Sequence, residues 1–105
     1  FDVQADGTLR NRRNFAKYRS VRPTPDGDNG ADGLTIDTDG RIYIATSLGV
    51  EVFDNRGDHL GIIRLSRAPQ NLAFAGPDKK TLYLVGRGAA WKIETLTQGY
   101  MGRAK

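Results

Sequence analysis

The sequence predicts an all-β fold of about two and a half antiparallel four-stranded meanders, each of the kind that forms one blade of a β-propeller. Three observations predict it. The chain has 13 glycines in 105 residues and is only 38% apolar, which is typical of short strands joined by tight turns. No segment shows a helical period. One strand-and-turn pattern recurs after about 38 to 40 residues, a period typical of blades, which need a neighbour on each face.

The clearest predicted element is a β-hairpin around Asp39 and Gly40. Residues 33–37 and 41–46 alternate between apolar and polar on either side of this pair, and an Asp-Gly turn supplies the positive φ that a tight hairpin needs. Two further runs, 50–53 and 59–65, are separated by a turn. Residues 31–67 are therefore expected to form one complete blade.

A second copy follows in residues 69–96, where 71–74, 81–85 and 88–93 repeat the first three strands and no fourth strand is evident. Leu34 matches Leu72, and Tyr43 matches Tyr83. We expect a last blade here. The tail is 97–105, and within it residues 99–105 have little alternation and are expected to be poorly ordered or loosely attached.

The N-terminal segment, 1–20, predicts the outer hairpin of an incomplete blade, with strands at 1–4 and 9–18. Residues 20–31 contain two prolines and several Gly and Asp residues, and are expected to be a loop that crosses to the next blade. Arginine and lysine crowd the N-terminal fifth of a chain whose formal net charge is +4. Because apolar residues interrupt them, they favour a charged edge strand over a nucleic-acid site.

Composition excludes several classes of site. The chain has no cysteine, so disulfides, zinc–thiolate sites and thiol catalysis are excluded. No apolar stretch approaches the length of about 20 residues that a membrane span requires, and no leader is visible, which slightly favours the cytoplasm. The serines have no nucleophile elbow or paired histidine around them, so serine-hydrolase chemistry is unsupported. No nucleic-acid or membrane partner is expected.

A resemblance is carried by three stretches in order: 1–3 with 11–16 (Asn-Arg-Arg-Asn-Phe-Ala), 31–46 (from Ala-Asp-Gly-Leu-Thr-Ile-Asp to Ile-Tyr-Ile-Ala-Thr), and 69–78 (Pro-Gln-Asn-Leu-Ala-Phe-Ala-Gly-Pro-Asp). Together they resemble the C-terminal part of the six-bladed propellers of the gluconolactonase, regucalcin (senescence marker protein) and luciferin-regenerating-enzyme family. Each stretch alone is ordinary blade sequence, whereas their order and spacing are specific. The resemblance implies a metal-dependent lactone hydrolase.

The resemblance also implies a site residue. In that family one divalent cation, usually calcium, is held on the axis by a glutamate, two asparagines and an aspartate. The aspartate begins an inner strand, and the matching position here is Asp32. A hard cation suits oxygen ligands and polarises a lactone carbonyl, and the aspartate is also a candidate general base. The alternative is that Asp32 is simply a turn residue, since Asp-Gly is among the commonest turn pairs.

Several other polar residues are candidates for a site. Asn71 begins the equivalent strand of the next blade, where it would either touch substrate or a metal ligand, or cap a turn. Asp26, Asp28 and Asp32 fail the EF-hand pattern, because Gly30 stands where an oxygen ligand is needed. His59 is expected at the surface. Glu51 and Glu94 are expected to face solvent from outer strands.

The implied glutamate and both asparagines have no match in these 105 residues. We therefore expect the isolated chain to bind no cation tightly and to hydrolyse no lactone. Uncovered blade faces and edges predict that its partners are the missing blades or a second copy of itself. Two function classes stay open: a fragment of a calcium-dependent lactonase acting on a sugar lactone, and a non-catalytic, self-associating scaffold module.

Overall fold

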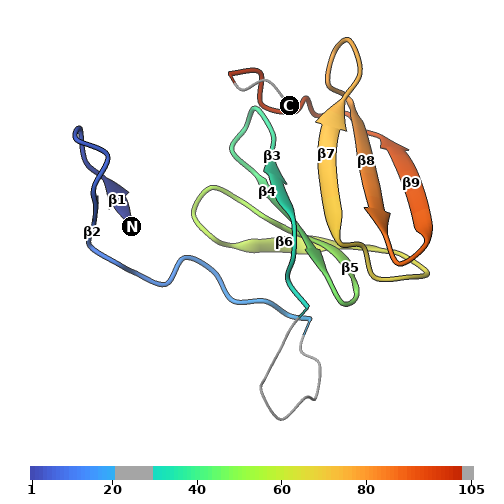
Figure 1. The fold of residues 1–105 in the computed structure, drawn as a ribbon, viewed down its shortest axis with the longest axis horizontal. Helices are drawn as coiled ribbons and strands as arrows, with labels where there is room; N and C mark the ends of the chain where they lie inside the picture. Colours follow the sequence, from blue (N-terminus) through green and yellow to red (C-terminus); the bar gives the residue numbers. More distant parts are fainter. Residues whose placement is uncertain (21–29, 103–105) are drawn as a thin grey trace.

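A computed structural model describes residues 1–20 and 30–102. These residues form antiparallel strands in three sheets and include no helix (Figure 1). None of them therefore belongs to a helix that could cross a membrane. The sheets contain two, four and three strands, in the order β1-β2, β3-β4-β5-β6 and β7-β8-β9. This is the partial propeller that the sequence predicts.

The four-stranded sheet is the complete blade. It contains β3 (Leu34–Ile36), β4 (Ile42–Thr46), β5 (Gly49–Phe53) and β6 (His59–Arg64). Gly40, in the turn between β3 and β4, has a φ of 75°, as the Asp-Gly hairpin predicts. The bounds of β5 and β6 agree with the predicted strands to within one residue.

The second sheet contains β7 (Asn71–Ala75), β8 (Thr81–Gly86) and β9 (Ala89–Glu94). Its strand register repeats that of the first sheet, since Leu34 pairs with Ile44 as Leu72 pairs with Leu84. The internal repeat seen in the sequence is therefore a repeat of structure.

The core lies between the two sheets. Fully or nearly fully buried apolar side chains from both sheets interlock there, and the rings of Tyr43 and Phe74 meet edge to face with centroids 5.2 Å apart. The complete blade contributes one face, and the last blade contributes the opposite face. The buried residues are Tyr43, Ala45, Val50, Leu72, Phe74, Leu82 and Leu84.

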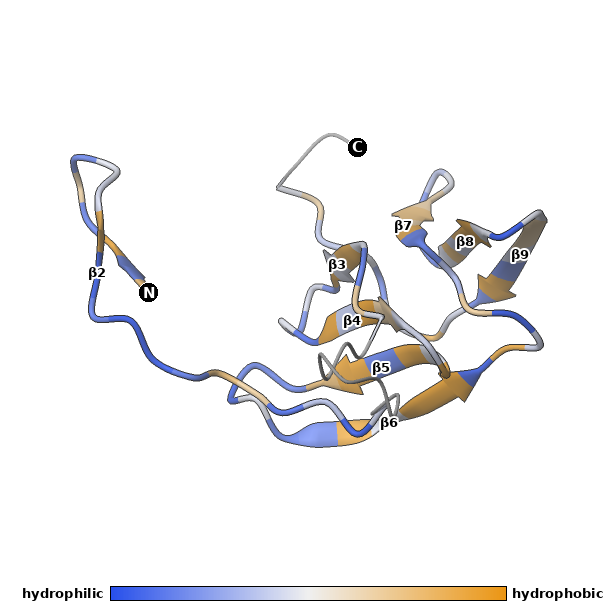
Figure 2. Ribbon diagram, turned by 60° about the horizontal axis from the view of Figure 1, so that its bottom comes forward, coloured by the Kyte–Doolittle hydropathy of each residue, from blue (hydrophilic) through white to orange (hydrophobic). Residues whose placement is uncertain are grey.

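Each sheet also has a second face. That of the last blade is open, and that of the complete blade is open along β3, whereas Phe53 on β5 is buried there under Tyr18. Leu34 is 55% exposed although its counterpart Leu72 is 3% exposed, and Tyr83 is 45% exposed although its counterpart Tyr43 is 7% exposed. Figure 2 shows apolar stretches along the strands of both sheets, whereas the N-terminal arm is largely hydrophilic. Equivalent side chains are thus covered only where a neighbouring blade is present, which is how blades stack.

The N-terminal arm differs from the prediction. Only β1 (Asp2–Val3) and β2 (Leu9–Arg10) are strands, and the hairpin stands apart from the body (Figure 1). The predicted strand at 9–18 is wrong beyond Arg10, because Asn11 has a φ of 53°, which breaks extended pairing. Most of the loop predicted at 20–31 lies outside the described residues.

The tail also differs from the prediction. It was expected to be loosely attached, but Gly99 forms a β-bridge with Asp37, and Tyr100 N–H donates to the Ile36 carbonyl at 3.1 Å. Thr97 Oγ1 donates to Asp37 Oδ2 at 3.0 Å. The tail therefore joins the turns of both blades at the end opposite Asp32. The last residues, 103–105, are outside the described part of the chain.

Asp37 is the centre of this junction. Its buried carboxylate accepts hydrogen bonds from Arg41 N–H at 2.9 Å, Arg41 Nη1 at 2.8 Å and the Tyr43 hydroxyl at 3.1 Å. Burial raises the pKa of Asp37, but the bonds from Arg41, Thr97 and Tyr43 outweigh it and hold the pKa below its usual value. Burial and the charge of Asp37 together raise the pKa of Tyr43 to about 12.

Candidate functional site

Asp32 lies just before β3, at the end of the blade where the inner strand begins. Its N–H donates to the Ala45 carbonyl at 3.0 Å, and Ala45 N–H donates back to the Gly33 carbonyl at 2.9 Å. The residue itself is exposed. The backbone of Asp32 is thus fixed on β4 while its carboxylate is free to meet solvent or a ligand.

Gly33 brings the two predicted site residues together. Its N–H donates to the Gln70 carbonyl at 2.8 Å, which ties the start of β3 to the residue before β7. A Cβ at Gly33 would overlap Asn71 Oδ1 and would stand 2.8 Å from Asn71 Cγ and 2.9 Å from Asn71 Cα. The φ of Gly33 is not positive. Glycine is therefore needed here for close approach of two inner strands, which sets Asn71 beside the residue that follows Asp32.

Asn71 is exposed, and its Oδ1 accepts the N–H of Leu72 at 2.9 Å. It also lines a shallow hollow of about 340 Å³ on the open face of the last blade, with Leu72, Ala73, Tyr83 and Val85. Both alternatives for Asn71 thus keep some support, since it caps its own strand start and also borders a concave surface.

The described residues do not make up a complete metal site. Among residues 1–20 and 30–102, no three Asp, Glu, His or Cys side chains gather in a group that could hold a metal ion. The Asp32 carboxylate and the Asn71 amide are hard oxygen donors of the type calcium binds, but calcium takes about six to eight oxygens. These two donors are fewer than such a site needs. Asp26 and Asp28 lie outside the described residues.

Glu51 and His59 are not at the surface, and both expectations were wrong. Glu51 is fully buried, and the side chain of His59 is only 9% exposed. Glu51 Oε1 accepts Ser20 N–H at 2.8 Å, and Oε2 accepts Arg19 N–H at 3.0 Å. His59 Nε2 lies 3.1 Å from Oε2, without the geometry of a directed hydrogen bond. Glu94, in contrast, is exposed as expected.

The burial of Glu51 leaves it ionised. Burial raises its pKa, but the backbone N–H groups of Arg19 and Ser20 and the nearby His59 outweigh this and hold the pKa of Glu51 below its usual value. A signal for the burial was present in the sequence. Alternate residues of a strand share one face, so Glu51 faces the same way as Phe53, which is 1% exposed.

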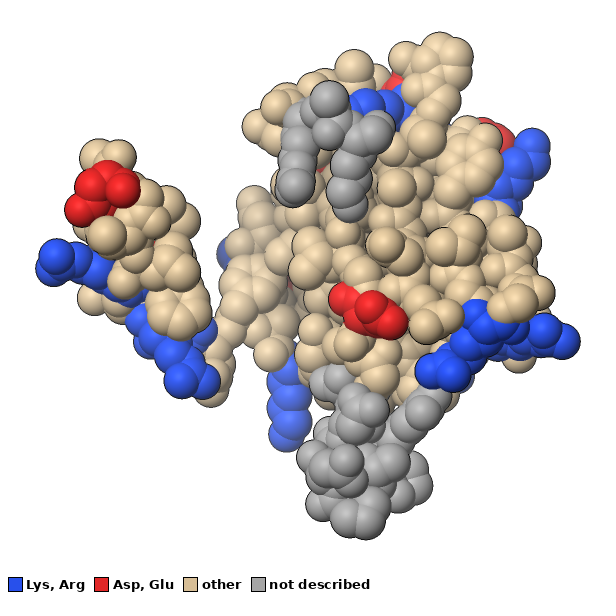
Figure 3. All heavy atoms as spheres, in the orientation of Figure 1, with Lys and Arg blue, Asp and Glu red and all other residues tan. Residues whose placement is uncertain are grey.

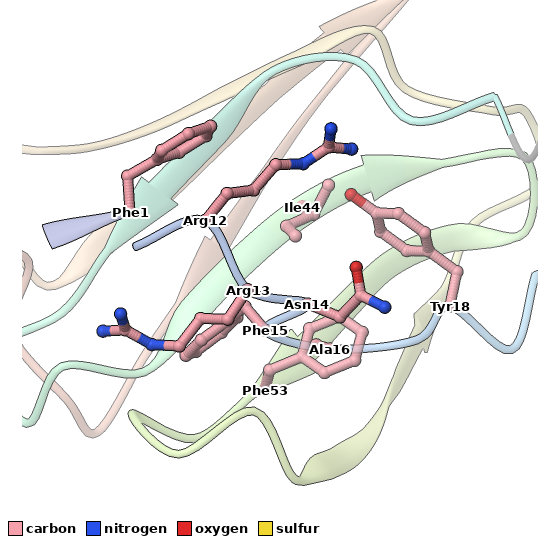
Figure 4. Close-up of a pocket in the computed structure, with 9 residues that line it drawn as sticks. All are labelled: Phe1, Arg12, Arg13, Asn14, Phe15, Ala16, Tyr18, Ile44 and Phe53. Atoms are coloured by element: carbon pink, nitrogen blue, oxygen red, sulfur yellow. The ribbon is translucent and has the colours of Figure 1, made fainter. Parts of the chain in front are cut away.

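A second hollow, of about 310 Å³, lies between the N-terminal arm and the complete blade. Figure 4 shows the aromatic rings of Phe1, Phe15, Tyr18 and Phe53 around it, together with the side chains of Arg12 and Arg13. Ile44 of β4 also lines this hollow. Figure 3 shows charged side chains on the arm and at the edges of the body and one acidic patch near the middle of the body, while the rest of the visible surface is mostly uncharged.

Comparison with known proteins matches residues 1–86 to the family described as SMP-30/Gluconolactonase/LRE-like region. The lactonohydrolase oryH of Aspergillus oryzae is 31% identical over 90 residues, which are 85% of this chain and 18% of that protein. The X-ray structure of a protein assigned as a gluconolactonase aligns with a TM-score of 0.63 and 38% identity, over 66% of this chain and 24% of its own.

The fold and these matches define the chain as part of a β-propeller of lactonase type. It belongs to the SMP-30/gluconolactonase/LRE-like family. It spans about a fifth of the length of the curated relative and about a quarter of the solved structure, as the shares of 18% and 24% show.

Proposed function

We propose that this chain is the part of a metal-dependent lactone hydrolase that contributes Asp32 to the cation site, and that it is inactive by itself. The observation that carries the proposal is the start of β3, where the Asp32 backbone is bonded to Ala45 and its carboxylate is exposed. The family match supports the lactonase class.

In this proposal Asp32 has two tasks. It is one oxygen ligand of a divalent cation, with calcium the favoured ion, which supplies Lewis acidity at the lactone carbonyl when bound. Its carboxylate also takes a proton from the attacking water as the new C–O bond forms, and the proton then passes to the ring oxygen as the ring C–O bond breaks. Asn71, one strand start away, contacts the sugar lactone or another ligand of the cation.

The test compares two lengths of the protein. The 105-residue chain and a product extended to the length of its relatives are assayed with glucono-1,5-lactone and titrated with calcium by calorimetry. We expect turnover and binding only in the extended product, and loss of both in Asp32→Ala. The matched control is Asp58→Asn, because the Asp58 side chain is 73% exposed in an outer turn. Turnover or micromolar calcium affinity in the 105-residue chain would refute the proposal.

A second candidate is a non-catalytic module that associates with itself, and the open faces favour it. Leu34 and Ile36 are 55% and 37% exposed on one sheet, and Tyr83 and Val85 are 45% and 50% exposed on the other. A second copy would cover them by repeating the contact that the two blades already make. Light scattering at micromolar concentration is expected to give more than one chain per particle, and a single-chain mass would contradict this candidate.

A further inference from the structure

The connection that leads from Ser20 to Asp32 is bonded at both of its ends to the complete blade, near the C-terminal end of β4. At its start, Ser20 Oγ lies 3.0 Å from Thr46 Oγ1, and the backbone of Ser20 is bonded to Glu51. At its end, Asp32 and Gly33 exchange backbone hydrogen bonds with Ala45. Consecutive residues of β4 thus receive the start and the end of the same connection.

Glu51 is the strongest of these attachments. Its carboxylate binds two successive N–H groups of a segment that has no strand partner, and it does so where no water reaches it. An ionised acceptor makes stronger hydrogen bonds than a neutral one, and its removal leaves the buried N–H of Ser20 and the part-buried N–H of Arg19 unpaired. His59 of β6 lies beside the same carboxylate, with its ring edge-on to Phe53 at a centroid distance of 5.2 Å.

We propose that Glu51 is a positioning residue for Asp32. By holding residues 19 and 20 against β5 and the C-terminal end of β4, it fixes the part of the blade that presents the Asp32 carboxylate. The proposal rests on the function proposed above for Asp32, and Glu51 itself touches neither substrate nor cation. The path runs from Glu51 to Ser20, from Ser20 to Thr46, and along β4 from Thr46 to Ala45.

Amide hydrogen exchange on the 105-residue chain tests the path without metal or activity. In Glu51→Gln one oxygen acceptor becomes an N–H donor facing a backbone N–H, so exchange at Arg19 and Ser20 should rise by about tenfold or more. Exchange at Asp32 should rise at least about threefold, while the amides of β8 keep their protection. The matched control is Glu94→Gln, since Glu94 lies on β9 and accepts a single bond from Thr81 at 3.0 Å. An unchanged rate at Asp32 overturns the proposal.

A second variant guards against loss of folding. Ser20→Ala removes only the hydroxyl that meets Thr46, and should raise exchange at Asp32 in the same direction by a smaller factor. In the extended product, Glu51→Gln should weaken calcium binding by about tenfold, as loss of a residue that orients a ligand does, and Glu94→Gln should not. Equal affinity in Glu51→Gln and wild type overturns this inference, whereas a wild type that binds no calcium overturns the proposed function and leaves the exchange result standing.

Discussion

Replacing Gly33 by alanine tests the close approach of β3 and β7. The added Cβ would overlap Asn71 Oδ1 and would lie 2.8 Å from Asn71 Cγ and 2.9 Å from Asn71 Cα. The side chain can turn away, but the Cα is backbone, so the two strand starts must separate by several tenths of an ångström. The hydrogen bond of 2.8 Å from Gly33 N–H to the Gln70 carbonyl lies in the same contact and would lengthen.

The expected loss of stability follows from two opposing terms. Overpacking at a closely packed site costs about 1 to 3 kcal/mol. A glycine whose φ suits alanine gives back about 0.4 to 1 kcal/mol, because the unfolded chain loses freedom. We therefore expect Gly33→Ala to destabilise the chain by about 1 to 2 kcal/mol. Gly61→Ala is the matched control, since Gly61, in β6, likewise has no positive φ, and a Cβ there meets nothing within 4 Å.

The assay is urea unfolding followed by fluorescence of Trp91, the single tryptophan, which packs against the core. All variants are compared at one protein concentration, because association changes apparent stability. Gly33→Ala combined with Asn71→Ala should recover part of the loss, since the contacts with Oδ1 and Cγ disappear and the one with Cα stays. A Gly33→Ala variant within about 0.5 kcal/mol of wild type would show that the inner strands do not meet as described.

Three further outcomes are expected. Leu84→Ala, at a fully buried position, should cost about 2 to 5 kcal/mol in urea unfolding, whereas Leu60→Ala, 54% exposed, should stay within about 0.5 kcal/mol. Asp37→Asn should cost about 1 to 3 kcal/mol and speed amide exchange at Gly99, because the amide replaces an acceptor of several bonds. Folding lowers the pKa values of Asp37 and Glu51, so both carboxylates stabilise the folded chain fully above about pH 5. The midpoint of thermal unfolding should therefore drop as the pH falls below about 4, and it should drop less in Glu51→Gln.

Elements that depend on local pattern could be predicted from the sequence. The hairpin at Asp39 and Gly40 is specified by alternation and by a turn that needs positive φ, and the second blade follows because the same pattern recurs. The position of Asp32 at an inner strand start follows from the same register. The need for glycine at position 33 could not be predicted from the sequence, because the atoms that a Cβ there would meet belong to Asn71 in the other blade.

Elements that depend on distant partners could not be predicted. The shared face with Phe53 indicates that Glu51 is buried, but it does not indicate the partners of Glu51. These are the backbone N–H groups of Arg19 and Ser20, which have no side-chain signature in a sequence. The tail shows no alternation because it pairs through isolated backbone bonds, such as Gly99 N–H to the Lys79 carbonyl at 2.8 Å. The order of these segments comes from the tertiary fold.

The junction at Asp37 gives the chain an order of assembly. Its bonds to Arg41 span four residues, and its bond to Thr97 spans 60. A hairpin closes within about 1 to 10 μs, but a contact across the longer separation must wait until the entropy of a long loop has been overcome. The Asp37 carboxylate is thus expected to bond to its own turn first and to the tail later. Its bond to Thr97 then forms together with the packing of the second blade.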